Sequence, residues 1–353
     1  MKKVSTLTIG VDVGDRYSQI CVIDGEGEIV EEGKLRTTAE AFEGRFAGQA
    51  SSLIVMEAGT HSPWLSQLLK DLGHECLVAN PASLYSGHRR KTDRIDAEKL
   101  ARWARADRSV LSPVEHAGPE IQADMALVHT RRALVETRTK LINRCRGMVK
   151  SRGYRLPRCD AAYFPERVRD FVPEQLVRAA VPLLRMISQA NEEIRALDEA
   201  IKELAGTKYG EATRLLEQVP GVGAITALTF VLTIRSPDRF FRSRQVGAYL
   251  GLTPAKKQSG ESDPELSITR AGNVYMRVLL VQCAQHILAR GPDSDLRRWA
   301  LAKAEGGKAA KRRAIVATAR KLAVLLHHLW KSGAVYEPLR KEVERAIPAA
   351  PAA

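Results

Sequence analysis

The chain has 353 residues, of which 44% are hydrophobic, and its formal net charge is +14. This length fits two or three domains, and the lack of any apolar run near the roughly 20 residues that span a bilayer excludes a membrane-embedded protein. A sequence pI near 9.7 favours a polyanionic partner such as nucleic acid, while the N-terminus without an export signal and the five scattered cysteines predict a cytoplasmic protein with reduced thiols.

Residues 1–110 predict an α/β domain with a mixed sheet. Five segments have the alternating pattern of strands: LTIGVDVG, SQICVID, EIVEEGKLRTT, SLIVMEAG and ECLVAN. A helical segment, WLSQLLKDLG, lies between the last two, and a second helix is predicted from about Thr92 to Arg105. Strands followed by a strand, helix and strand unit are typical of a sheet with both antiparallel and parallel pairs.

Residues 111–208 predict a helical, coiled-coil region, with long helices over about 120–149 and 175–204. Apolar residues in the second helix recur in steps of three and four: Ile187, Ala190, Ile194, Leu197, Ile201 and Leu204. This seam fits a coiled coil between two chains, and it fits equally a helix pair packed within one chain.

Residues 209–345 predict a mainly α-helical domain broken by glycine loops. The segments VPGVGAITA and GLTPAKKQSGESDPELSITRAGN precede a basic helix, KAAKRRAIVATARKLAVLLHHLW. The tail over residues 346–353, rich in alanine and proline, is expected to be disordered.

Four acids form a candidate metal site. Asp12 and Glu57 each end a predicted strand, and neighbouring parallel strands would bring both carboxylates to one sheet edge. Asp93 and Asp96 stand three apart on one face of a predicted helix. Such close like charges require a cation, and hard oxygen ligands select Mg²⁺, with Mn²⁺ as an alternative. Two such ions would support phosphoryl transfer.

Other interpretations of these acids stay open. Asp93 and Asp96 fit equally well as surface acids paired with Arg89, Arg90 or Lys99. The segment GVDVG also resembles the first phosphate loop of an actin-like or sugar-kinase ATPase, but the sequence lacks the second phosphate loop and the adenine-binding glycine segment of those proteins.

Two regions are candidate nucleic-acid contacts. Residues 129–158 hold ten lysines or arginines and one acid, Glu136, which favours phosphate contacts over a merely solvated helix face. The candidates there are Arg138, Lys140, Arg144 and Arg146. The turn containing Gly221 and Gly223 predicts backbone N–H groups that hold a phosphate, although a plain turn between helices has the same pattern.

The loop after residue 250 contains a candidate nucleophile. Ser259 stands between Gln258 and Gly260, and three further candidates for nucleic-acid contact lie close in sequence: Lys256, Lys257 and Arg270. A serine before glycine is also ordinary turn chemistry. As a nucleophile it would need activation by a metal or a base.

Together these motifs resemble the DEDD transposases of bacterial insertion sequences, which are bridge-RNA-guided recombinases related to Piv-type DNA invertases. The resemblance spans nearly the whole chain, through GVDVG, EAGTHSPWLSQLL, VANP, KTDRIDAEKLARWAR, VPGVGAITAL, YLGLTPAKKQSG, ITRAGNVYMRVLL and ARKLAVLLHHLW. Matched motif by motif, the four acids of the family fall on Asp12, Glu57, Asp93 and Asp96, and its serine falls on Ser259.

The resemblance implies an RNase H-like (RuvC-like) domain, a coiled-coil insertion and a C-terminal transposase domain. It implies that Ser259 attacks a DNA phosphodiester to form a phosphoserine link while the acids bind Mg²⁺. The active site would be composite within a homo-oligomer, a dimer or tetramer. A structured guide RNA would pair with donor and target double-stranded DNA, which leaves shape recognition to the protein.

Two alternatives belong to other functional classes. One is a protein-only site-specific invertase or a Holliday-junction nuclease on the same fold; in a nuclease, water is the nucleophile and Ser259 is dispensable. The other is a non-enzymatic nucleic-acid-binding protein whose acids only cap helices and form ion pairs. Metal-dependent strand chemistry separates it from both enzymes.

Overall fold

The computed structural model describes residues 7–81, 93–259, 262, 264 and 266–340. The chain divides into two compact units, Met1–Pro119 and Glu120–Ala353. The predicted division of the second unit at residue 209 stays a prediction, and the tail over residues 346–353 lies outside the described residues.

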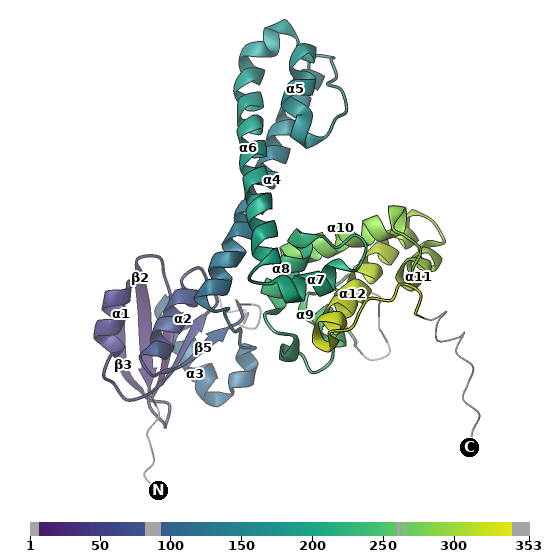
Figure 1. Ribbon diagram of the computed structural model, residues 1–353. Helices are drawn as coiled ribbons and strands as arrows, with labels where there is room; N and C mark the ends of the chain where they lie inside the picture. The colour runs from purple at the N-terminus through teal and green to yellow at the C-terminus, as the bar shows by residue number, and fades with distance from the viewer. Residues whose placement is uncertain (1–6, 82–92, 260–261, 263, 265, 341–353) are drawn as a thin grey trace, which may run out of the picture. The chain divides into compact units, whose positions relative to one another are not determined.

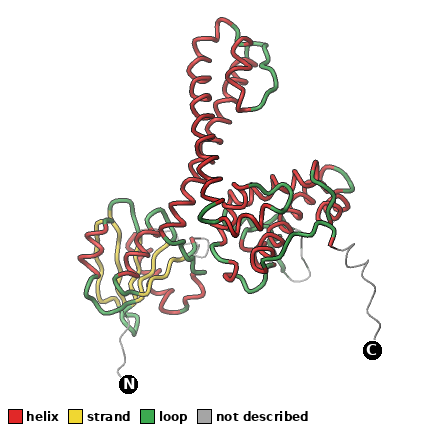
Figure 2. The backbone as a smooth tube through the Cα atoms, in the orientation of Figure 1, coloured by secondary structure: helices red, strands yellow, loops and turns green. Residues whose placement is uncertain are grey.

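The first unit is built on a five-stranded mixed sheet (Figures 1 and 2). Its strand order is β3-β2-β1-β4-β5; the first three pair antiparallel, and β1, β4 and β5 pair parallel. The strands are β1 (Thr8–Asp12), β2 (Tyr17–Ile23), β3 (Ile29–Arg36), β4 (Leu53–Glu57) and β5 (Glu75–Ala79). The helices are α1 (Ala39–Phe46), α2 (Ser62–Asp71), α3 (Asp93–Ala106) and the 3-10 helix η2 (Arg108–Leu111). The predicted mixed sheet is confirmed.

Helices cover both faces of this sheet. On one face, alternate strand residues such as Val11 and Ile54 pack against Phe42 and Phe46 of α1 and Leu65 of α2. The other face carries α3. There Ala97 packs with Cys21 and Ile23, and Leu100 packs with Leu53 and Val55. The period of two along the strands thus places apolar residues on both faces, as expected for a sheet buried between helices.

The second unit begins with a long antiparallel helix pair, α4 (Pro119–Lys150) and α6 (Glu174–Gly206). Arg131 pairs with Asp198, and Arg138 donates a hydrogen bond to Asn191, so residue numbers rise along α4 as they fall along α6. The two helices lie side by side in Figures 1 and 2. In the chain, α4 and α6 are connected by η3 (Ala161–Tyr163), α5 (Phe164–Val168) and η4 (Arg169–Phe171).

The apolar seam of α6 is buried within the chain. Ile187 packs in a cluster with Ile142 and Cys145 of α4, and Ile201 packs with Val128. Packing within one chain therefore accounts for these seam residues, and pairing between two chains stays a prediction.

The remaining helices form the core of the second unit. They are α7 (Gly210–Glu217), α8 (Ala224–Ile234), η5 (Pro237–Arg239), α9 (Arg244–Tyr249), α10 (Val274–Arg290), α11 (Asp295–Ala304) and α12 (Lys308–Ser332). Helix α8 is its centre, because residues 226–234 are all buried. Val128 of α4 and Ile201 of α6 belong to the same core as Leu228 and Leu322.

Two expectations from composition can be compared with the fold. The described residues include no helix that combines the length and apolar composition needed to cross a bilayer. The five cysteines are free thiols. Burial raises the pKa of Cys21 to about 11 and that of Cys76 to about 12, so both stay protonated near neutral pH.

Candidate functional site

Asp12 and Glu57 lie at one edge of the sheet. Asp12 is the last residue of β1 and Glu57 the last of β4, and these strands are parallel neighbours in which Val11 lies opposite Met56. Both acids line a pocket of about 340 Å³, together with Asp15 and His61. The strand ends thus place two carboxylates in one cavity, as the sequence predicts.

The first turn of α3 faces the same edge. Gly10 of β1 lies against Ala97 of α3, because a Cβ at Gly10 would stand 1.9 Å from the Ala97 carbonyl oxygen. At the other end of α3, the Arg105 guanidinium donates a hydrogen bond of 2.6 Å to the carbonyl of Gly25. Gly25 follows β2, whose last residue, Ile23, pairs with the first residue of β1. Helix α3 therefore runs opposite to β1, and its N-terminus lies toward the edge that holds Asp12.

Asp93 and Asp96 begin this helix but do not line the pocket. Asp93 is exposed, and Asp96 accepts a hydrogen bond of 3.2 Å from Lys99. This contact is the surface pairing that the alternative interpretation predicts. Among the described residues, no three His, Cys, Asp or Glu side chains are grouped closely enough to hold a metal ion. The structure therefore brings together two of the four predicted acids, with the other two at the same edge.

The candidate nucleophile belongs to the second unit. Ser259 is exposed, and its backbone N–H donates to the Ser262 carbonyl at 3.1 Å, with the reciprocal bond also 3.1 Å. Nearer the base, Ala255 donates to the Ser267 carbonyl at 2.9 Å, so the loop is a hairpin with Ser259 near its tip. Lys256 and Lys257 are also exposed on this hairpin.

The base of the hairpin is tightly packed. Gly251 and Gly272 both have a positive φ, and a Cβ at Gly272 would lie 2.2 Å from the Tyr249 carbonyl oxygen. The buried guanidinium of Arg277 donates to the Leu250 and Gly272 carbonyls at 3.2 Å each. Burial, together with the nearby Arg270, lowers the pKa of Arg277. Sequence analysis missed Arg277, because a lone arginine in an apolar helix gives no sign of the carbonyls it contacts.

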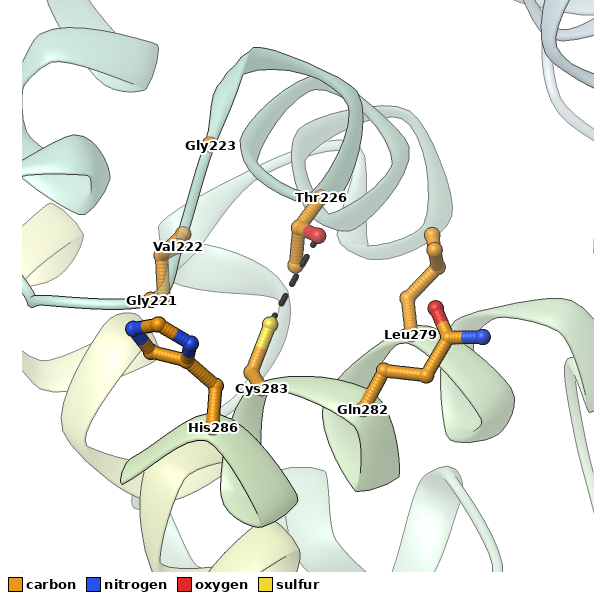
Figure 3. A pocket seen from close by; sticks show the side chains of 8 residues that line it. All are labelled: Gly221, Val222, Gly223, Thr226, Leu279, Gln282, Cys283 and His286. Atoms are coloured by element: carbon orange, nitrogen blue, oxygen red, sulfur yellow. Dashed lines mark hydrogen bonds between the residues drawn. The ribbon is translucent and has the colours of Figure 1, made fainter. Parts of the chain in front are cut away.

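The glycine turn borders a second pocket, of about 450 Å³ (Figure 3). Gly221 has φ +91°, and a Cβ there would come within 2.9 Å of the His286 ring. Gly223 is the residue that precedes α8. Figure 3 shows His286 and Gln282 of α10 on the opposite wall, with Cys283 hydrogen-bonded to Thr226 between them. Both exposed polar side chains were missed by sequence analysis.

Comparison with known proteins decides the family. Residues 9–152 match the family model of DEDD transposases, and residues 213–298 match the model described as the transposase IS116/IS110/IS902 family. The transposase of insertion sequence element IS1111A from Coxiella burnetii is 30% identical over 337 residues, covering 92% of this chain and 89% of its own. The chain belongs to this transposase family.

Other transposases are similar over much of their length. A putative transposase, y4rJ, from Sinorhizobium fredii is 30% identical and covers 92% of this chain and 88% of its own. The transposase of element IS1328 from Yersinia enterocolitica is 27% identical over 67% of this chain and 71% of its own. Members of the transposase family are enzymes that cleave and recombine DNA, so the protein is an insertion-sequence transposase that acts on DNA.

In this transposase, the basic stretch of α4 contains two kinds of cation. Arg138 donates to Asn191 at 2.9 Å, and burial lowers the pKa of its guanidinium. Arg146 donates to the Pro157 carbonyl at 3.1 Å and lies 5.1 Å from the Phe164 ring centroid. Lys140 and Arg144, by contrast, are exposed. The first pair holds the helical region together, and the second is available to a polyanion.

The exposed cations give a prediction about binding. Replacing Lys140, Arg144, Lys150 and Arg152, all of which are exposed, with Gln is expected to weaken binding to DNA of any sequence. If each contacts one phosphate, the slope of log K against log salt should fall by about three to four, since each neutralised phosphate contributes about 0.9. The measurement is a filter-binding or anisotropy titration across salt concentrations.

The matched comparison uses the inward-facing cations. Arg138→Gln removes the hydrogen bond to Asn191, and Arg146→Gln removes the hydrogen bond to the Pro157 carbonyl. Both variants should therefore have a lower melting temperature than wild type, with a salt slope close to the wild-type value. An unchanged salt slope in the variant with four surface substitutions would mean that these cations form a solvated helix face and do not contact phosphates.

Proposed function

We propose that this transposase performs Mg²⁺-dependent cleavage and strand exchange of double-stranded DNA through Ser259, in an RNase H-like arrangement of acids. The observation that carries the proposal is the placement of Asp12, Glu57 and the first turn of α3 at one edge of the sheet. Ion pairing alone gives no reason for acids from two separate strands to line one pocket, with a helix that begins with two further acids directed toward the same edge. A phosphoryl-transfer site does.

Two of the four proposed ligands share a pocket, and carboxylates are the ligands that a hard divalent cation prefers. Asp12 and Glu57 share a pocket in which two carboxylates repel each other unless a cation lies between them, and Mg²⁺ prefers carboxylate oxygens and water. Asp93 and Asp96 would complete the set from α3. A bound ion would supply Lewis-acid stabilisation of the phosphate and its leaving oxygen, and Mn²⁺ has similar ligand preferences.

Ser259 supplies the nucleophilic oxygen in this proposal. Its Oγ forms a bond to the phosphorus as the bond from that phosphorus to one deoxyribose oxygen breaks, and the departing oxygen takes up a proton as the hydroxyl gives one away. Attack by a free DNA hydroxyl then reverses the exchange and restores the serine. Ser259 is exposed, as are Lys256 and Lys257 shortly before it in the chain, so a phosphate backbone can reach the hydroxyl and both cations.

The proposal includes a guide. The acids and Ser259 belong to different compact units of the chain. We propose that the acids of one subunit and Ser259 of another form a composite site in a dimer or tetramer. We also propose that a structured RNA from the element pairs with donor and target DNA. The contacts proposed for the helix pair and the glycine turn are to phosphates, which carry no sequence information, so in this proposal base pairing with the RNA selects the DNA sequence.

The test is to purify the protein from cells that carry its natural flanking DNA and to sequence the RNA that accompanies it. Strand exchange between donor and target DNA should be lost after ribonuclease treatment and restored by adding back the transcript. Changing the pairing segment of the transcript should redirect the target. Exchange that withstands complete removal of RNA would favour a protein-only invertase.

A further inference from the structure

His61 lines the same pocket as Asp12 and Glu57, yet the acid motifs do not include it. It stands directly before α2, and its side chain is 30% exposed. The turn that carries it is fixed by Ser62, whose hydroxyl accepts from the Gly59 N–H at 2.9 Å and donates to the Gly59 carbonyl at 2.8 Å. The backbone that carries the His61 imidazole is therefore held by hydrogen bonds at the edge of the sheet.

The contact with Trp64 sets the tautomer of His61. The indole Nε1–H donates to His61 Nδ1 at 3.1 Å, and the two rings meet edge to face with centroids 6.1 Å apart. An indole nitrogen can only donate, so Nδ1 must be the acceptor, and the proton of the neutral imidazole is on Nε2. Trp64 is itself anchored, because its ring packs edge-on against the buried Phe42 at 6.4 Å.

The Nε2–H group remains available. Its nearest described acid, Asp15, lies 3.7 Å away, which is longer than a hydrogen bond, and the Asp15 side chain is 93% exposed. The other side-chain donors that line the pocket are Thr60 and Ser62. The Ser62 hydroxyl is already occupied, since it contacts His116 Nε2 at 2.8 Å as well as Gly59.

We propose that His61 donates its Nε2–H to a non-bridging oxygen of the phosphate undergoing exchange, and that Trp64 positions it to do so. This inference rests on the proposed function of the pocket. Phosphoryl transfer concentrates negative charge on these oxygens, and a donor whose direction is fixed in advance stabilises that charge without reorganising during the reaction. Ionised carboxylates can only accept hydrogen bonds, so Asp12 and Glu57 cannot fill this role.

The test compares three substitutions of His61 in the full-length protein. Loss of one preorganised donor typically costs about 10²- to 10³-fold in rate, so His61→Ala should lower the rate of strand exchange by about 10²-fold. The side-chain amide of His61→Gln reaches the position of Nε2 and should recover part of this loss. The amide of His61→Asn reaches only the position of Nδ1 and should recover none. DNA affinity should be unchanged in all three variants.

A second measurement does not depend on activity. Nitrogen NMR of labelled histidine, assigned with His61→Gln, should show Nδ1 as an acceptor and Nε2 as protonated in the wild-type protein. Trp64→Phe keeps an aromatic ring but removes the indole donor. The histidine signals should therefore move toward a mixture of tautomers, and the rate of DNA strand exchange should fall. The control is His328→Gln, which alters an exposed histidine of α12 that does not line the pocket and should leave the rate of strand exchange unchanged.

Several outcomes would overturn the inference. Two results would contradict the role of His61 as a donor and leave the proposed function intact. One is a His61 ring protonated on Nδ1. The other is a His61→Ala variant that exchanges strands as fast as wild type while Asp12→Asn is inactive. Equal losses in the Gln and Asn variants would reduce His61 to a packing role. Activity retained by Asp12→Asn would instead contradict the proposed function itself.

Discussion

Asp12→Asn is expected to abolish strand exchange, with a loss on the order of 10⁴-fold, as is typical when a principal catalytic group is removed. The substitution keeps the size of the side chain but removes the charge that a divalent ion requires. DNA binding should persist, because a carboxylate opposes rather than assists phosphate binding. The measurements are exchange between donor and target DNA under Mg²⁺, and binding in a gel-shift assay.

The control is Asp71→Asn, an exposed acid of α2 that lies outside the pocket and should have no effect on exchange. Asp96→Ala tests the other part of the site and should be as inactive as Asp12→Asn. Chelation should stop the wild-type reaction, and Mg²⁺ or Mn²⁺ should restart it. Activity retained by Asp96→Ala would leave that acid as the surface partner of Lys99. Exchange by Asp12→Asn in the presence of a chelator would contradict the metal site.

Most of the first unit follows from the pattern of its sequence. All five predicted strands are present, because each alternates or clusters apolar residues between turns. The helix α1 was missed. It has only eight residues, and its apolar signal consists mainly of Phe42 and Phe46, both of which are completely buried. A pair four residues apart is too short a pattern to predict a helix without knowing the sheet that it covers.

The parts of the candidate site that could be predicted from the sequence are those that a short sequence pattern marks. Asp12 and Glu57 could be placed together because parallel strands that end in acids share an edge. The sequence does not single out His61 or Arg277, since what distinguishes them is their contacts in the fold, with an indole and with backbone carbonyls. A count of charges likewise cannot separate Arg138, which contacts Asn191, from the exposed Lys140.

Reaction of the wild-type protein with labelled DNA is expected to leave a covalent protein-DNA adduct that survives denaturation, and Ser259→Ala is expected to eliminate it. The reason is that a serine nucleophile forms a phosphodiester to the protein, whereas water leaves none. The base of the hairpin is held by Arg277 and by the close packing at Gly272, whereas Ser259 is exposed and does not contribute to the core. Ser259→Ala should therefore fold normally and bind DNA.

Ser262 and Ser267 are the matched controls, because both are exposed serines on the same hairpin and both make backbone hydrogen bonds across it. Their alanine variants keep those bonds and should still form the adduct at close to the wild-type rate. Mapping the labelled peptide by mass spectrometry distinguishes the three positions. An adduct at Ser262 or Ser267 would mean that this serine, and not Ser259, is the nucleophile. Efficient cleavage by Ser259→Ala without any adduct would mean that water attacks the phosphate, and the acids at the sheet edge would then belong to a nuclease rather than to a recombinase.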